Sequence, residues 1–85
     1  MISRKIDGLA NITGNEIKRL RIERKLSRQE LSNKLMMLGI DINNDGIYRI
    51  ENGKRIVKDF ELAALAKVLD TTETELLNKF RENLK

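Results

Sequence analysis

The chain has 85 residues, of which 40% are hydrophobic, and it carries 17 Lys and Arg against 13 Asp and Glu, for a formal net charge of +4. A chain of this length folds as one small domain around a single apolar core. Cys and His are both absent, which excludes disulfides, Cys and His nucleophiles and the commonest zinc ligands. The remaining carboxylates, lysines and hydroxyls do not group into a site, so we expect no enzymatic activity, no cofactor and no metal.

The positive charge is unevenly distributed along the chain. Residues 1–58 carry 13 Lys and Arg against 7 Asp and Glu, whereas residues 59–85 carry 4 against 6. A basic region before residue 59 favours a polyanionic partner, although surface charge also serves solubility. The sequence contains no run of about 18 apolar residues and no continuous apolar stretch near its start. We therefore expect a cytoplasmic protein without a membrane partner.

The first half of the chain shows helical periodicity. A Ser/Thr-x-x-Glu sequence satisfies unpaired N–H groups at a helix start, and three such sequences are present, at Thr13/Glu16, Ser27/Glu30 and Thr72/Glu75. The first predicts a helix over about 14–25. The second predicts a helix over about 28–38, which Gly39 would end.

Two further helices are predicted in the last third of the chain. Asp59 is expected to cap a helix with the sequence FELAALAKVL, whose apolar face would comprise Phe60, Leu62, Ala63, Leu65, Ala66 and Leu69. The last helix is predicted to run through about Asn83, with four apolar residues, Leu76, Leu77, Phe80 and Leu84. Sustained alternation of apolar and polar residues is lacking, so a sheet is not expected. The predicted fold class is all-α.

Residues 41–52, with the sequence DINNDGIYRIEN, allow three interpretations. The first six residues fit the start of a calcium loop, but Asn52 stands where that loop needs Glu. The Asp45-Gly46 pair fits a hairpin turn, although an isolated two-stranded hairpin is marginally stable. A helix capped by Asn43 and ended by Gly53 explains more residues, at a cost of about 1 kcal/mol for a glycine inside it. We favour this helix, over about 44–52, and retain calcium binding as an alternative that a calcium titration would test.

Three segments in order, IKRLRIERKLSRQELSNKL, IYRIENGKR and FELAALAKVLDTTETELL, carry a specific resemblance. From about Glu16 to Leu77, the chain resembles the helix-turn-helix domain of phage-repressor-like and Xre-like bacterial regulators. The resemblance implies a five-helix lambda-repressor-like DNA-binding domain, in which the helices at 28–38 and 44–52 form the motif. It implies an N-terminal arm at 1–12, the helix-turn-helix domain at 13–78 and a C-terminal helical extension at 79–85.

The pattern of apolar residues agrees with this resemblance. Ser32 occupies the place where a small side chain lets the two helices of the motif approach closely. The seam between these helices would be formed by Leu31, Leu35, Ile47 and Ile50. The connection is longer than the family's tight turn, because MMLGIDIN lies between the apolar seam and the second helix. We expect an extra turn on the helix at 28–38, followed by an extended segment at 40–42.

If the two isoleucines face inward, four side chains project outward, namely Asn44, Asp45, Tyr48 and Arg49. The resemblance places these four at base-reading positions, with Arg49 suited to guanine and Asn44 to adenine. Alternatively, Asp45 completes the helix cap and Tyr48 packs over the surface.

The resemblance also implies a set of phosphate contacts, made by Arg28, Asn43, Asn52, Lys54 and Arg55. The alternative for the loop cations, including Lys58, is a solvated basic loop. Arg21 and Glu51 match a structural salt bridge of the family, so neither is expected to contact DNA.

The implied function is that of a sequence-specific double-stranded-DNA-binding transcriptional regulator. We expect a repressor that acts as a homodimer on a palindromic operator with half-sites about 34 Å apart, because one reading helix contacts few base pairs. Candidate dimer surfaces are the segment 80–85 and the Met36/Met37 pair, and the alternative is that Phe80 and the two methionines complete the core. The alternative is an antitoxin that binds a toxin protein and autoregulates its operon, which a neighbouring toxin gene or a co-purifying partner would indicate.

Overall fold

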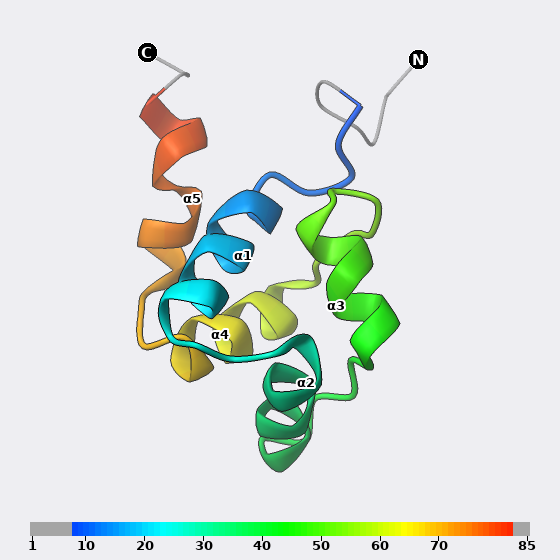
Figure 1. Ribbon diagram of the computed structural model, residues 1–85. Helices are drawn as coiled ribbons and strands as arrows, with labels where there is room; N and C mark the ends of the chain where they lie inside the picture. Colours follow the sequence, from blue (N-terminus) through cyan, green and yellow to red (C-terminus); the bar gives the residue numbers. More distant parts are fainter. Residues whose placement is uncertain (1–7, 83–85) are drawn as a thin grey trace.

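The computed structural model describes residues 8–82 (Figure 1). This part of the chain forms five helices and no strand ladder: α1 (Gly14–Glu23), α2 (Arg28–Met37), α3 (Asn44–Glu51), α4 (Asp59–Val68) and α5 (Glu73–Glu82). α3 packs on α1 and α2, while α4 packs on α2 and α5. The prediction of an all-α, five-helix domain is confirmed. No helix in the described part of the chain is both long and apolar enough to cross a membrane.

Three of the predicted helix caps are present. Ser27 and Glu30 form the reciprocal capping box, in which each backbone N–H donates to the other side chain, at 2.8 and 3.0 Å. These bonds lower the pKa of Glu30 below its ordinary value, because the carboxylate accepts the Ser27 N–H. Asn43 Oδ1 accepts the N–H of the third residue of α3 at 2.7 Å, and Thr72 Oγ1 accepts the Glu75 N–H at 3.1 Å. Local sequence therefore determines where α2, α3 and α5 begin.

Two predicted caps are wrong. The Thr13 side chain makes no capping bond, and instead Asn11 Oδ1 accepts the N–H groups of Thr13 and Gly14 at 3.0 and 2.8 Å. Asp59 is the first helical residue of α4 rather than its cap. The α4 start is satisfied by Glu61, whose carboxylate accepts the N–H of Lys58 at 3.0 Å. In both cases a polar side chain near the predicted position is better placed to accept the free N–H groups.

Four helices end in the same way, with a residue of positive φ after the last turn. At the end of α2, the Gly39 N–H donates to the Met36 carbonyl and the next N–H donates to the Leu35 carbonyl, at 2.9 and 3.0 Å. Gly39 and Gly53 adopt φ of 80° and 70°, as predicted for the ends of α2 and α3. At the ends of α1 and α4 the same conformation is taken by non-glycine residues, Lys25 and Asp70. The predicted helix ends are correct to within two residues; Asn83 and Leu84 lie outside the described residues.

The core draws on all five helices. Its fully buried side chains are Ile17, Leu31, Leu35, Ile42, Ile47, Ile50, Leu65, Leu69 and Leu76. The predicted apolar face of α4 is partly wrong, because Phe60 is 55% exposed and Ala63 is also exposed. The most buried side chains of α4 include Glu61, Leu65 and Leu69, which follow each other at four-residue spacing. Phe60 comes one residue before this row, so its side chain points to a different side of the helix. Phe60 instead packs beneath the Lys58 ammonium, 5.8 Å from the ring centroid.

The long connection between α2 and α3 is anchored to the core. Ile42 is buried, and its carbonyl accepts a hydrogen bond from Ser32 Oγ at 2.6 Å. Ser32 is itself 6% exposed, so the expected close approach at this position is observed. Because this bond fixes the residue just before the Asn43 cap, the start of α3 is held against α2 despite the longer connection.

The structure decides between the three interpretations of residues 41–52. Most of this stretch is α3, and the helical interpretation is confirmed. The hairpin is wrong, and one oxygen ligand of the calcium loop is otherwise used, because Asn43 Oδ1 caps α3. Nowhere within residues 8–82 do three or more His, Cys, Asp or Glu side chains gather as metal ligands.

Candidate nucleic-acid interface

The outward side of α3 presents the four side chains that the sequence predicted there. Ile47 and Ile50 are 0% and 1% exposed and anchor the helix, whereas Asn44, Asp45, Tyr48 and Arg49 are all exposed. Figure 1 shows α3 along one side of the molecule, with its outer side uncovered by any other labelled helix. The helix therefore offers a polar surface on a rigidly held element.

Arg49 and Asp45 lie one turn apart on this surface. Their Nη1 and Oδ2 atoms are 4.0 Å apart, and their side chains are 57% and 74% exposed. An exposed pair of this kind stabilises a helix only slightly. Asp45 can thus orient the Arg49 guanidinium without preventing it from leaving for a stronger acceptor. Asp45 also lies in the first turn of α3, where a negative charge is favourable.

Tyr48 is half exposed and is covered on one side by Arg28. The Arg28 Cζ atom lies 5.1 Å from the Tyr48 ring centroid, within range of a cation–π contact. Arg28 is the first residue of α2, so this contact joins the start of α2 to the middle of α3. Tyr48 therefore packs against Arg28 on one side and remains accessible to a ligand elsewhere.

Glu51 links the three helices that surround the site. Its carboxylate is fully buried and accepts from Arg21 Nε at 2.6 Å and Nη2 at 3.3 Å, and from Arg28 Nε at 3.0 Å. The Arg21 and Glu51 pair implied by the resemblance is present. The second arginine was not predicted, because sequence reasoning assigned Arg28 to phosphate alone. Two arginines on one carboxylate fix α1, α2 and α3 in one arrangement.

The predicted phosphate-binding residues lie around the two ends of α3, but most also have a partner within the protein. Asn43 Oδ1 caps α3, and Asn52 Nδ2 donates to the Tyr48 carbonyl at 2.8 Å. Arg28 holds Glu51 through Nε only. Lys54 is exposed and has no ion pair within the described part of the chain. Lys54 is therefore the one of these five residues without a hydrogen bond or ion pair from its side chain in the described part of the chain.

Arg55 differs from the other predicted phosphate contacts. Its guanidinium donates to both oxygens of Glu61, each at 3.0 Å, and also to the Ile56 carbonyl at 3.0 Å. The hydrogen bond to Glu61 raises the pKa of Arg55, and the same bond lowers the pKa of Glu61. Glu61 is 4% exposed. This pair ties the loop after α3 to the start of α4.

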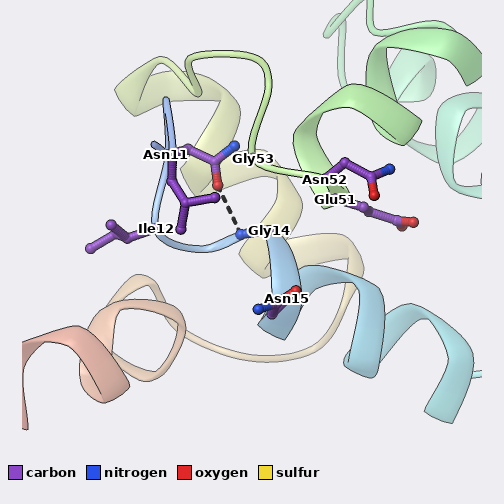
Figure 2. Close-up of a pocket in the computed structure, with 8 residues that line it drawn as sticks. Asn11, Ile12, Gly14, Asn15, Glu51, Asn52 and Gly53 are labelled. Carbon is purple, nitrogen blue, oxygen red and sulfur yellow. Dashed lines mark hydrogen bonds between the residues drawn. The ribbon is translucent and has the colours of Figure 1, made fainter. Parts of the chain in front are cut away.

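The segment that precedes α1 also holds the end of α3, through contacts that the sequence did not predict. Asn11 Nδ2 donates to the carbonyls of Ile50 and Arg55 at 3.0 and 2.8 Å, while its Oδ1 caps α1 (Figure 2). The Ala10 N–H donates to the Gly53 carbonyl at 2.7 Å. A hollow of about 160 Å³ lies beside these contacts, lined in part by Leu9, Asn15 and Asn52.

Gly14 is required where α1 meets the end of α3. A Cβ atom at this position would collide with the Ile50 carbonyl oxygen. The first turn of α1 therefore lies directly against the backbone of α3, and no side chain separates them. This close approach, together with Asn11, determines the position of the α3 C-terminus.

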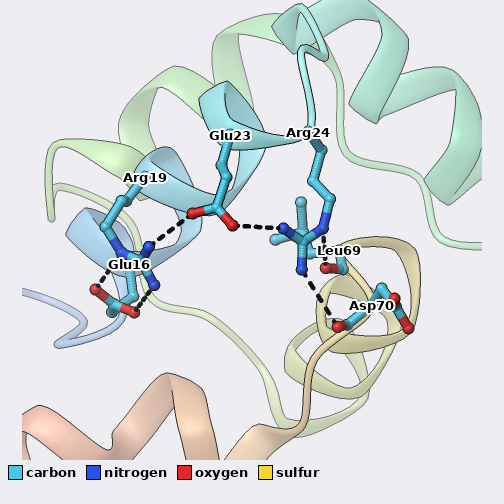
Figure 3. A network of polar contacts seen from close by, with 6 residues as sticks. All are labelled: Glu16, Arg19, Glu23, Arg24, Leu69 and Asp70. Carbon is cyan, nitrogen blue, oxygen red and sulfur yellow. Dashed lines mark hydrogen bonds and ion pairs between the residues drawn. The ribbon is translucent and has the colours of Figure 1, made fainter.

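The other arginines of α1 belong to a separate ion-pair strip, which we call the α1 strip (Figure 3). Arg19 binds Glu16 and Glu23, with the shortest contacts at 3.0 and 2.9 Å. Arg24 binds Glu23 at 3.1 Å and donates to the Leu69 carbonyl at 2.8 Å. These arginines are engaged by carboxylates and by the end of α4, so they do not add to the positive charge beside α3.

Comparison with known families agrees with this geometry. A family model described as helix-turn-helix matches residues 17–76, more than half of the chain. The chain belongs to the Xre and lambda-repressor-like helix-turn-helix family. A search of curated proteins gives no significant match. Membership identifies a DNA-binding transcriptional regulator whose motif helices are α2 and α3.

Proposed function

We propose that this helix-turn-helix protein recognises a specific duplex DNA site by placing α3 in the major groove. The observation that supports this most directly is the division of α3 into two faces. Ile47 and Ile50 are fully buried, whereas Tyr48 and Arg49 stand in solvent. A helix fits the major groove, where the edges of each base pair are distinguishable. A rigidly anchored helix with exposed polar groups is suited to this kind of reading.

Each outward residue has a role that follows from its chemistry. Arg49 donates two hydrogen bonds to guanine O6 and N7, and Asp45 orients it before binding. Asn44 pairs with adenine or approaches a phosphate. Tyr48 contacts a thymine methyl group or the backbone, while Arg28 fixes the plane of its ring.

The phosphate contacts in this proposal come from both ends of α3. Lys54 is the principal cation, and Arg28 contributes the guanidinium nitrogens that do not hold Glu51. Asn43 and Asn52 also donate to phosphates in this proposal, Asn43 through Nδ2 and Asn52 through the second hydrogen of its Nδ2, the first being donated to the Tyr48 carbonyl. Arg55 acts through Glu61 to position the loop that carries Lys54.

Repression by a homodimer is part of the same proposal. One copy of α3 reads only a few base pairs, and two copies related by a two-fold axis would read a palindromic operator. Occupation of that operator by the dimer would block transcription. Because phosphate neutralisation releases counterions, the affinity should fall by about 0.9 log units per log unit of salt for each phosphate contacted.

The test begins with selection from a random duplex library, followed by binding measurements on the selected site and on random DNA. Arg49→Ala should weaken binding to the selected site by about 1–3 kcal/mol and affect random DNA much less. Lys54→Ala should weaken both to a similar degree. Arg81→Ala, which removes an exposed positive charge from α5, is the matched control and should change neither. Equal losses on both DNAs for Arg49→Ala would remove its base-reading role.

A further inference from the structure

An apolar hollow lies between the last turns of α2 and α4. It has a volume of about 240 Å³. We call the five residues that line it the Met37 patch: Lys34, Met37, Leu38, Lys67 and Val68. Met37 is 85% exposed, and the neighbouring Met36 is 53% exposed. Contiguous exposed apolar side chains of this kind mark interaction sites.

The fold does not need the Met37 patch. The inward positions of α2 are filled by Leu31 and Leu35, which are fully buried. The last turn of α2 ends with its own backbone bonds at Gly39. Met37 therefore contributes almost no burial within the described domain.

The patch is also separate from the proposed DNA face. Ser32 and Leu35 are the α2 residues on the α3 side, since Ser32 bonds to the segment that leads into α3. Lys67 and Val68 come from the C-terminal end of α4, which Figure 1 shows on the side of the molecule away from α3. A partner bound at the patch would therefore leave α3 uncovered.

The charges around the hollow are of one sign. Lys34 comes from α2 and Lys67 from α4, both are exposed, and neither forms an ion pair among residues 8–82. No acidic residue lines the hollow. Glu30, one turn before Lys34, interacts with it electrostatically, but the Glu30 carboxylate is held by its capping box with Ser27 and forms no ion pair with Lys34. The hollow is thus an apolar depression with an unpaired ammonium group from each helix.

The hollow can accommodate one large apolar side chain. An empty protein cavity of about 150 Å³ admits benzene, so about 240 Å³ is sufficient for a leucine or phenylalanine side chain. Methionine adapts its shape to such a group, because it is unbranched and polarisable.

We propose that the Met37 patch binds an acidic, amphipathic segment of another protein. One apolar side chain of that segment enters the hollow, and its carboxylates pair with Lys34 and Lys67. A second copy of this chain is a poorer occupant, because a two-fold contact through the patch brings two pairs of lysines together. Dimerisation on DNA through another surface leaves the patch open in each copy.

The experiment is a selection of displayed random peptides on the 85-residue chain. Enriched peptides should combine a Leu, Phe or Trp with at least two Asp or Glu. A synthetic selected peptide should shift the NMR signals of Met37, Leu38 and Val68. The double variant Lys34→Glu/Lys67→Glu should bind it at least about tenfold more weakly, and a peptide with Lys in place of its acids should bind that variant instead. Lys18→Glu/Arg81→Glu, with the same change in charge, should bind the selected peptide normally.

Several results would overturn the proposal. One is enrichment of neutral or basic peptides, or of none. Another is peptide binding that the Lys34 and Lys67 reversals leave unchanged. Self-association of the chain that Met37→Ser abolishes would assign the patch to a second copy. Met37→Ser should keep its melting temperature and its DNA affinity while losing the peptide; loss of DNA affinity in this folded variant would assign the patch to the DNA interface.

Discussion

Two clusters of arginine and glutamate lie on opposite sides of α1 and use the same chemistry for different ends. In one, the buried Glu51 carboxylate binds Arg21 and Arg28 and joins three helices. In the other, the α1 strip, Arg19 and Glu23 are more than half exposed and belong to the same helix. Ion pairs of similar length therefore differ in effect according to burial and to the elements they connect. Of the two clusters, it is the Glu51 cluster that helps to determine where the outward face of α3 points.

Removing the charge of Glu51 should have the largest effect. Glu51→Gln leaves the buried Arg21 and the partly buried Arg28 facing a neutral group, and we expect a loss of about 3–5 kcal/mol in the free energy of unfolding. Small domains have only about 5–15 kcal/mol of stability, so this loss should remove a large fraction of it and lower the urea midpoint accordingly. Urea denaturation followed by circular dichroism measures the change.

The matched control is Glu23→Gln, which removes the same charge from an exposed position of the α1 strip and should be nearly neutral. An apolar replacement of the whole cluster, Arg21→Met with Arg28→Leu and Glu51→Leu, should recover much of the lost stability. If Glu51→Gln and Glu23→Gln were equally mild, burial would not explain the difference between the two clusters.

The pair of Arg55 and Glu61 lies between these extremes, with the arginine 29% and the glutamate 6% exposed. The hydrogen bond from Arg55 lowers the pKa of Glu61 below its ordinary value of 4.5. A lowered carboxylate pKa adds stability above the unfolded-state pKa, and this stability is lost as the pH falls through the folded-state pKa. Glu61→Gln should cost about 1–3 kcal/mol at pH 7.

The measurement is the melting temperature between pH 7 and pH 2 for the wild type and Glu61→Gln. The difference between the two proteins should be constant above about pH 5 and should shrink as the medium becomes more acidic. Arg55→Gln should show the same convergence. A difference that persisted unchanged at low pH would mean that Glu61 acts by packing and not by its charge.

Whether the sequence predicts a feature of this structure depends on how far apart in the chain the residues that form it are. The caps at Ser27 and Asn43 use partners three residues away, and the sequence located them correctly. The inward positions of Ile47 and Ile50 follow from helical periodicity alone. These local features placed the outward face of α3 correctly.

The missed features depend on residues far apart in the chain. Asn11 bonds to carbonyls 39 and 44 residues away, and Arg28 bonds to Glu51 across 23 residues. Spacing cannot show which distant groups meet, so an arginine with an internal partner looks the same in sequence as one free for phosphate. Arg28 illustrates this, because the sequence suggested a phosphate contact for it and gave no sign of its bond to Glu51.

The smallest expected effect is that of a substitution within the α1 strip, where two arginines, Arg19 and Arg24, can be compared. Among the described residues, the ion pairs of Arg19 are with side chains of its own helix, Glu16 and Glu23, and the hydrogen bond to Glu16 raises the pKa of Arg19. Arg24 instead donates to the Leu69 carbonyl beyond the end of α4, and so joins two helices. Arg19→Ala should leave the melting temperature unchanged within about 2 °C, because solvent screens exposed pairs. Arg24→Ala should lower it by several degrees, about the effect of one lost hydrogen bond of 1 kcal/mol. Equal effects of the two substitutions would show that the number of ion pairs matters in this strip, and not the elements that they join.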